Sequence, residues 1–341
     1  MTAFSGTMQE SKPKRGKIAE GKFRRRVTEW FASNARNLPW RLTTDPYAIL
    51  VSEMMCQQTQ VGTVMPFFER WMHRFPDCAT LAAATEQEVM ALWQGLGYYS
   101  RARNLHRAAK AVAGGEFPRT LEAIRALPGV GRYTAGAIAA FAYDEPAALV
   151  DANIARVLAR VFAIREPIDG AAGLARVWEK AEELQPERGG RAFNAGLMEI
   201  GALICTPRAP DCDRCPIAQS CAALAGGLQG ELPAKNPRRR TERLAEPCAL
   251  MTRDGQILLE HQSGARWRGL WKLPAVERIP ETAPDLVIEY PFTHHKVTLS
   301  VYRQRAPRGQ REGSAWHAIA GLAEVPIAAA HRRALERLLG K

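Results

Sequence analysis

Four of the chain's seven cysteines lie close together, and this cluster constrains the fold more than any other feature. The four are Cys205, Cys212, Cys215 and Cys221. The first residues of the chain contain no apolar run of the kind found in secretion signals, so metal ligation is favoured over disulfides. Four thiolates suit zinc or an iron–sulfur cluster, and their spacing alone does not separate the two.

Hydrophobic periodicity divides the rest of the chain into parts. Before the cysteines and around them, apolar residues recur at intervals of three and four, as Leu50, Met54, Val61 and Val64 do, which predicts helices. Further on, alternating residues predict strands at 248–251, 256–260, 286–290 and 297–302, followed by a helix at 328–339. We therefore expect a flexible basic arm (1–22), an all-helical domain (23–225), a basic linker (226–243) and a small α+β domain (244–341).

The charge of the chain indicates its class of partner. The formal net charge is +12 and the pI is about 9.6, which favours a polyanion, most commonly a nucleic acid. No apolar run approaches the ~20 residues of a membrane-spanning helix, so we expect no membrane partner.

A glycine-rich turn at Pro128-Gly129-Val130-Gly131 precedes one predicted helix, and Asp151 precedes the next. Backbone N–H groups at such a turn bind anions, and the helix dipole adds to the attraction. Asp151 stands where a helix N-cap stands. The segment is therefore either a phosphate-binding hairpin beside a functional carboxylate or a helical hairpin with an ordinary cap.

Two further stretches carry candidate functional residues. Glu53 lies within an apolar helical run, where burial raises the pKa of a carboxylic acid toward that of a general acid; a solvent-facing Glu near a helix start is the alternative. Tyr98 follows a glycine turn and precedes Arg101 and Arg103, a combination that suits base stacking with phosphate contact. A helix cap with a core tyrosine explains the same residues.

Taken together, these segments resemble the MutY-type adenine DNA glycosylases of the helix-hairpin-helix superfamily, which also holds endonuclease III. The matching motifs, in the order of the family, are LPW at 38–40, SEMMCQQTQ at 52–60, GLGYY at 95–99, LPGVGRYTAGA at 127–137, VDANIARVLAR at 150–160, and the cysteine loop. The resemblance covers about residues 23 to 341.

The resemblance implies the activity and the partners. It implies removal of adenine paired with 8-oxoguanine or guanine in double-stranded DNA, by a monomer in the bacterial cytoplasm at the nucleoid. It also implies a [4Fe-4S] cluster on the four cysteines.

Site residues are carried over position by position. Glu53 matches the acid that protonates adenine, and Asp151 matches the carboxylate that stabilises the cationic sugar; we expect the pKa of Glu53 to be raised and that of Asp151 to be lowered by its helix N-terminus. Gln58 and Tyr98 match residues inserted into the duplex. The hairpin Leu127, Pro128, Gly129, Val130 and Gly131 matches the DNA-backbone contact. Residues matched to the adenine or catalytic pocket are Arg36, Leu38, Trp40, Arg41 and Asn153.

Tyr133 occupies the hairpin position where endonuclease III-like lyases carry a lysine. A lysine amine forms a Schiff base with the sugar and then cleaves the strand, whereas tyrosine has no amine. We therefore expect base removal without efficient strand cleavage, with Tyr133 helping to position Asp151. An endonuclease III-type lyase and a non-catalytic iron–sulfur DNA-binding protein are the alternatives.

The C-terminal part resembles the MutT-like (Nudix-fold) domain of the same family. Its metal-binding carboxylate box is absent, so lesion recognition is expected rather than nucleotide hydrolysis. The family's Phe-Ser-His loop is Phe292, Thr293 and His294 here, and threonine keeps the hydroxyl. Cys56 and Ala195 also depart from the usual residues, and Glu199 is a candidate substitute for the side chain missing at Ala195.

Overall fold

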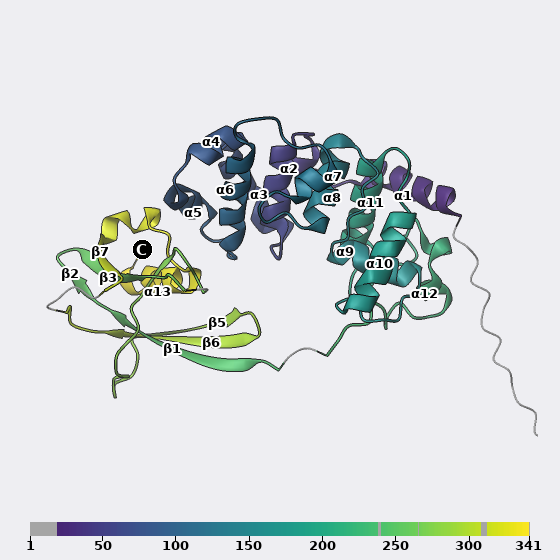
Figure 1. The fold of residues 1–341 in the computed structure, drawn as a ribbon. Helices are drawn as coiled ribbons and strands as arrows, with labels where there is room; N and C mark the ends of the chain where they lie inside the picture. Colours follow the sequence, from purple (N-terminus) through teal and green to yellow (C-terminus); the bar gives the residue numbers. More distant parts are fainter. Residues whose placement is uncertain (1–18, 238–239, 265, 308–311, 341) are drawn as a thin grey trace, which may run out of the picture. The chain divides into compact units, whose positions relative to one another are not determined.

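The computed structural model describes residues 19–237, 240–264, 266–307 and 312–340 (Figure 1). The chain forms two compact units, each built from two separate segments. The first unit comprises Met1–Arg36 and Val150–Lys235, and the second comprises Asn37–Leu149 and Asn236–Lys341. Most of the predicted basic arm, residues 1–18, lies outside the described residues.

The first unit is helical. Its elements are α1 (Glu20–Asn34), α9 (Ala152–Val161), α10 (Ala171–Glu183), α11 (Gly190–Leu203), η2 (Ala218–Ser220) and α12 (Ala222–Ala225). Helix α1 packs closely on α11, because Gly196 has no side chain: a Cβ there would lie 2.7 Å from Val27. Beside this contact, Phe23 meets Phe193 edge to face. This packing buries the apolar stripe of α1.

The second unit begins with helices. They are η1 (Pro39–Arg41), α2 (Pro46–Cys56), α3 (Val61–Arg74), α4 (Cys78–Ala83), α5 (Glu86–Trp93), α6 (Ser100–Val112), α7 (Leu121–Arg125) and α8 (Arg132–Tyr143). Helix α2 is buried from Tyr47 to Met55 and packs against α3, α6 and α8. Asp45 caps its start by accepting hydrogen bonds from two backbone N–H groups. Any polar side chain on α2 therefore lies in a desolvated setting.

The second unit continues with strands and a last helix. They are β1 (Glu242–Leu250), β2 (Thr252–Arg253), β3 (Gln256–His261), β4 (Trp271–Lys272), β5 (Leu286–Phe292), β6 (His295–Arg303), β7 (Ser314–Ala318), η3 (Ile319–Glu324) and α13 (Ala329–Leu339). One sheet has the order β1-β6-β5, in which β1 and β6 are parallel and β5 and β6 antiparallel. In the other, β3 pairs antiparallel with β2, β4 and β7. Apolar side chains of both sheets and of α13 share one core.

The predicted fold class, a helical domain with a small α+β part, is confirmed. All four predicted strands are present but longer, and β1 begins at Glu242 rather than at residue 248. The hairpin turn at Asp254-Gly255 is also confirmed, with both residues at positive φ. The two-residue strands β2 and β4 were missed because so short a segment shows no alternation, and the five-residue strand β7 was also missed. The domain boundaries remain a prediction, since the compact units follow a different division of the chain.

Candidate functional site

Glu53 is a buried carboxyl on α2, as the apolar run predicted. Only 6% of its surface is exposed. Tyr133, on the first turn of α8, donates its hydroxyl to Glu53 Oε2 at 2.6 Å. Tyr133, at the position where endonuclease III-like lyases carry a lysine, is thus hydrogen-bonded to the candidate general acid. The sequence did not predict this contact. The expected role of Tyr133 toward Asp151 remains a prediction.

The glycine hairpin before α8 uses its two glycines differently. Gly129 has φ +77°, and a Cβ there would lie 2.4 Å from Asn104 Cβ on α6, so both backbone and packing require glycine. Gly131 caps α8 with φ −91°, which any residue adopts, and a Cβ there would meet no atom within 4 Å. Leu127 and Val130 are buried and anchor the turn. The fold therefore requires a glycine at position 129 but not at position 131.

Gln58 and Tyr98 are exposed residues at the tips of two short loops. Both have positive φ, +54° for Gln58 and +46° for Tyr98, which is uncommon for residues with a side chain. Tyr98 is 55% exposed, although an aromatic ring of this size is usually covered. The backbone thus presents both side chains outward at a cost in strain.

Arg101 joins these two loops. It is the second residue of α6 and only 6% of its surface is exposed. Nη1 donates to the carbonyls of Met54, Met55 and Gln57, and Nη2 donates to those of Leu96 and Gly97 and to Thr59 Oγ1, over 2.5–3.2 Å. The positive charge also lies at the C-terminal end of α2, which the helix dipole favours.

The suggested phosphate contact of Arg101 is therefore wrong. Its guanidinium faces inward because the loop carbonyls on both sides need donors, and a buried charge needs acceptors. Burial lowers the pKa of Arg101 to about 10, so it keeps its charge at neutral pH. The sequence signal that was overlooked is an arginine directly after the start of a helix that follows a turn with two glycines, Gly95 and Gly97.

Asp151 caps α9 in the first unit, as predicted. Its Oδ1 accepts from the Ile154 N–H at 2.7 Å, and its Oδ2 accepts from Asn153 Nδ2 at 2.9 Å. The expected lowering of its pKa is wrong. Burial raises the pKa of the Asp151 carboxyl and outweighs these hydrogen bonds and the charge of Arg156, which act in the opposite direction.

Two buried arginines of α9 hold the cysteine loop. Arg156 donates to the carbonyls of Gly201 and Cys205 and to Asn153 Oδ1. Arg160 donates to the carbonyls of Thr206, Pro207 and Leu232, and its Nη1 lies 3.2 Å from Cys205 Sγ. Hydrogen bonds thus connect Asp151 through Asn153 and Arg156 to the backbone carbonyl of Cys205, the first cysteine of the loop. Sequence reasoning missed both arginines, because their acceptors are backbone groups far along the chain.

The four thiols line a common cavity together with Arg160 and Ile204. Burial raises the pKa of Cys215 to about 11, and it also raises those of Cys212 and Cys221, so these groups need a metal to become thiolates. In some groups of three or more His, Cys, Asp or Glu side chains, the possible ligand atoms all lie within 4.8 Å of one another. Within the described residues, none of these groups includes one of the four thiols. The shared cavity brings the four thiols together as candidate ligands of one metal centre.

The remaining predicted residues lie in varied settings. Arg36 donates to the fully buried Glu199 carboxylate at 2.6 Å, so Glu199 is engaged by Arg36. Leu38 and Trp40 are buried in the helical core of the second unit, where Trp40 meets Phe68 edge to face. Arg41 is partly buried.

The predicted lesion loop forms the turn between β5 and β6. Phe292 packs edge to face on Trp267, which anchors the turn to the domain core. Thr293 is exposed with φ +54°, and its Oγ1 lies 3.2 Å from His295 Nδ1. His294 is partly exposed beside it.

The candidate residues are shared between the two units. Glu53, Tyr133, the glycine hairpin, Gln58, Tyr98 and the β5–β6 turn belong to the second unit. Asp151, Asn153, Arg36 and the four cysteines belong to the first.

Replacing Arg101 tests its role as the support of the two loops. Arg101→Met removes six hydrogen bonds, of which those to the Met54, Met55 and Leu96 carbonyls are fully buried, so we predict a loss of about 3–5 kcal/mol in the free energy of unfolding. Arg101→Lys should recover only part of it, because an ammonium cannot span both loops. Denaturant unfolding measures both losses. Arg107→Met, at an exposed position of the same helix, is the control, and equal stability of the Arg101→Met and Arg107→Met proteins would contradict the role.

Comparison with known proteins places the chain in a family. Residues 51–181 match the HhH-GPD superfamily base excision DNA repair protein family. A solved structure of a thermostable thymine-DNA glycosylase is similar, with 31% identity and a TM-score of 0.54, covering 61% of this chain and 97% of that one.

Two curated relatives are both called adenine DNA glycosylase. The rat protein (Rattus norvegicus) is 44% identical over 250 residues, 70% of this chain and 48% of the rat protein. The chain thus spans about half the length of this mammalian relative. The protein of Buchnera aphidicola (subsp. Schizaphis graminum) is 32% identical over 257 residues, 74% of this chain and 74% of that protein. With this identity over most of both proteins, the chain belongs to the adenine DNA glycosylase family.

Proposed function

We propose that the protein removes adenine opposite 8-oxoguanine or guanine in double-stranded DNA, leaving an abasic site without efficient strand cleavage. The observation that carries this proposal is the buried carboxyl of Glu53, hydrogen-bonded to a tyrosine at the position where lyases use a lysine. The names of the relatives support adenine as the target.

Glu53 acts as the general acid in this proposal. Adenine is a poor leaving group, and a proton delivered to the base makes departure easier, typically by 10²–10⁴-fold. The hydroxyl of Tyr133 fixes the orientation of the Glu53 carboxyl through the 2.6 Å hydrogen bond. Burial on α2 keeps bulk water from this carboxyl.

Asp151 stabilises the positive charge that develops on the sugar. Its raised pKa means that the ionised form is disfavoured in the free protein, because burial removes water and the local hydrogen bonds compensate only in part. The oxocarbenium ion that develops on the sugar is positively charged. It therefore stabilises the buried carboxylate, which is only partly compensated in the free protein. The interaction is thus stronger in the transition state than with the neutral substrate, which is the requirement for catalysis.

The DNA backbone and the stacked bases contact the second unit. The N–H groups at the start of α8 suit a phosphate, and the missing side chain of Gly131 allows the backbone to come close to it. Gln58 and Tyr98 enter the duplex and hold the adenine out of the stack, a step that costs a few kcal/mol. Arg36, Leu38, Trp40, Arg41 and Asn153 shape or support the pocket for the base and sugar.

Tyr133 sets the point at which the reaction stops. No amine is present at this position to form a Schiff base with the sugar, so hydrolysis by water ends the reaction at an abasic site.

Cys205, Cys212, Cys215 and Cys221 would hold a [4Fe-4S] cluster, which supplies structural cross-linking of the loop when bound. Arg160 Nη1, 3.2 Å from Cys205 Sγ, places a positive charge beside the loop that would hold the cluster. In the second unit, Phe292, Thr293 and His294 read the 8-oxoguanine, with hydrogen bonds from a hydroxyl and an imidazole.

A cleavage assay separates this function from its alternatives. The protein is incubated with duplexes carrying A opposite 8-oxoguanine, A opposite G, or thymine glycol, and breaks are compared with and without hot alkali. We expect alkali-dependent breaks at A, and no covalent adduct on borohydride treatment. Alkali-independent breaks at thymine glycol would indicate a lyase, and tight binding without breaks a non-catalytic protein. Glu53→Gln should lose at least about 10²-fold in rate, whereas Glu122→Gln, at an exposed position of α7, should not.

The two glycines of the hairpin give a matched pair of variants. Gly131→Ala should weaken duplex binding by about 5–10-fold, roughly 1 kcal/mol, and leave the free energy of unfolding nearly unchanged, because the fold has room for the added methyl. Gly129→Ala should instead destabilise the protein by more than about 1 kcal/mol, because of its positive φ and the contact with Asn104. Fluorescence anisotropy and denaturant unfolding measure the two effects. Wild-type affinity of Gly131→Ala would count against the phosphate contact.

The pH dependence of base release tests Asp151. The reaction needs ionised Asp151, so its rate falls as the pH falls through the pKa of this group, which burial places above the ordinary aspartate value. Asn153→Ala removes a donor to the carboxylate, so the pKa should rise further and the acid limb should move up by about 0.5–1 pH unit. Single-turnover rates over a pH series measure the shift. Asn34→Ala, on α1 of the same unit, is the control. An unmoved acid limb in Asn153→Ala would rule out this role of the hydrogen bond.

A further inference from the structure

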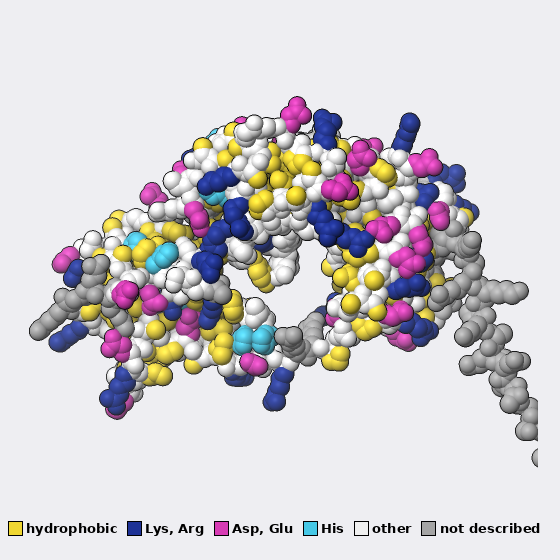
Figure 2. Space-filling view, viewed as in Figure 1, with side chains coloured by type: hydrophobic (Ala, Val, Ile, Leu, Met, Phe, Trp, Pro, Cys, Tyr) yellow, Lys and Arg dark blue, Asp and Glu magenta, His cyan; other side chains and the backbone are white. Residues whose placement is uncertain are grey.

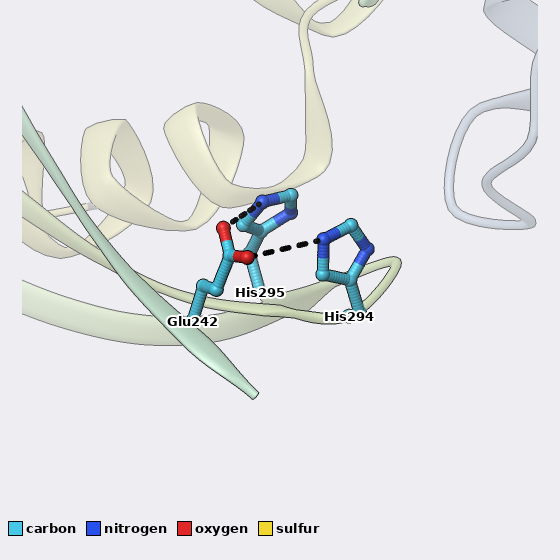
Figure 3. A group of neighbouring side chains, drawn as sticks. All are labelled: Glu242, His294 and His295. Atoms are coloured by element: carbon cyan, nitrogen blue, oxygen red, sulfur yellow. Dashed lines mark ion pairs between the residues drawn. The ribbon is translucent and has the colours of Figure 1, made fainter. Parts of the chain in front are cut away.

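Three side chains of metal-binding types converge at the tip of the β5–β6 hairpin. His294 and His295 turn their Nε2 atoms toward the carboxylate of Glu242, the first residue of β1 (Figure 3). His295 Nε2 lies 3.3 Å from Oε2, and His294 Nε2 lies 4.0 Å from Oε1. Histidine side chains are visible on the surface over this end of the hairpin (Figure 2).

The strand register brings these residues together. β1 runs parallel to β6 with Glu242 opposite His295, and the Glu242 N–H donates to the His294 carbonyl at 3.1 Å. The turn between β5 and β6 consists of Thr293 and His294 alone, because Phe292 already pairs with His295. The two imidazoles therefore leave adjacent positions on the same side, with ring centroids 3.9 Å apart. Backbone pairing, rather than a flexible loop, sets the positions of all three ligands.

The spacing suits one tetrahedral divalent ion. Zinc bonds to imidazole nitrogen and carboxylate oxygen are about 2.0–2.2 Å long, which places neighbouring ligand atoms about 3.3–3.5 Å apart. The ligand atoms of the three residues all lie within 4.8 Å of one another. The His295–Glu242 distance already fits, and a rotation of the exposed Glu242 side chain would bring the His294 distance into range.

The second ring nitrogen of His295, Nδ1, also has a hydrogen-bond partner. Thr293 Oγ1 lies 3.2 Å from His295 Nδ1. When Nδ1–H donates to this hydroxyl, the lone pair of the ring is on Nε2, which faces Glu242. Histidine ligands of metals usually have such a partner on the other ring nitrogen, which fixes both tautomer and orientation.

We propose that Glu242, His294 and His295 form a binding site for a divalent transition metal ion of the zinc type. Three protein ligands leave a fourth position open to water. The site is separate from the four-cysteine loop, which lies in the other unit. It uses His294 as a ligand, so a bound ion and a lesion would compete for the same side chain. That consequence rests on the proposed reading of 8-oxoguanine by this turn, whereas the metal site itself does not.

Zinc binding by the full chain tests the site. The protein, with its cysteine loop loaded with iron and sulfide, is dialysed against Zn²⁺ alone, and bound zinc is counted per chain. Wild type should bind one more zinc ion than Glu242→Gln or His295→Asn, or bind it at least about 10-fold more tightly. His73→Asn, at an exposed position of α3, should behave as wild type. Equal zinc binding by all four proteins would overturn the proposal.

A second measurement addresses the competition. Zinc should slow adenine release opposite 8-oxoguanine in wild type by several-fold more than in His295→Asn. If the protein released no adenine at all, the proposed function would fail while the dialysis result still decided the metal site. Equal inhibition of both proteins, with the zinc difference present, would show that the site exists but does not compete with the lesion.

Discussion

Buried guanidinium groups hold the parts of this protein that the proposed reaction uses. Arg101 donates to two loops of the second unit, and Arg156 and Arg160 donate to the cysteine loop of the first. A buried charge is tolerated only when its N–H groups find acceptors, and loop carbonyls removed from water need donors. Each arginine therefore fixes loops that have little regular structure of their own. The exposed, strained positions of Gln58 and Tyr98 depend on this support.

The carboxyl groups of Glu53 and Asp151 were expected to lie in opposite environments, but the two environments are alike. Both are removed from bulk water, Glu53 on the buried helix α2 and Asp151 at the start of α9. Their distinction lies in their partners: Glu53 accepts from a tyrosine hydroxyl, and Asp151 accepts from a backbone N–H and an amide. Hydrogen bonds favour ionised Asp151 but do not offset its burial. In the proposed reaction, the positive charge that develops on the sugar stabilises the ionised Asp151 carboxylate.

The sequence allowed prediction of the helices, the main strands and the motif residues, because hydrophobic periodicity and turn residues are local signals. It did not reveal that residues 37–149 and 236–341 form one compact unit, since such grouping depends on contacts between distant segments. The roles of Arg101, Arg156 and Arg160 were missed for the same reason. The direction of the Asp151 pKa was wrong because capping was visible in the pattern and burial was not. The Tyr133–Glu53 hydrogen bond joins residues 80 positions apart.

The central claim is that the bond broken joins adenine to its sugar. Chromatography of the small molecules released from a duplex with A opposite 8-oxoguanine tests it most directly. The account predicts free, intact adenine in amounts equal to the abasic sites formed, and loss of both in Asp151→Asn. Release of a different base, or strand breaks that appear without free adenine, would contradict it.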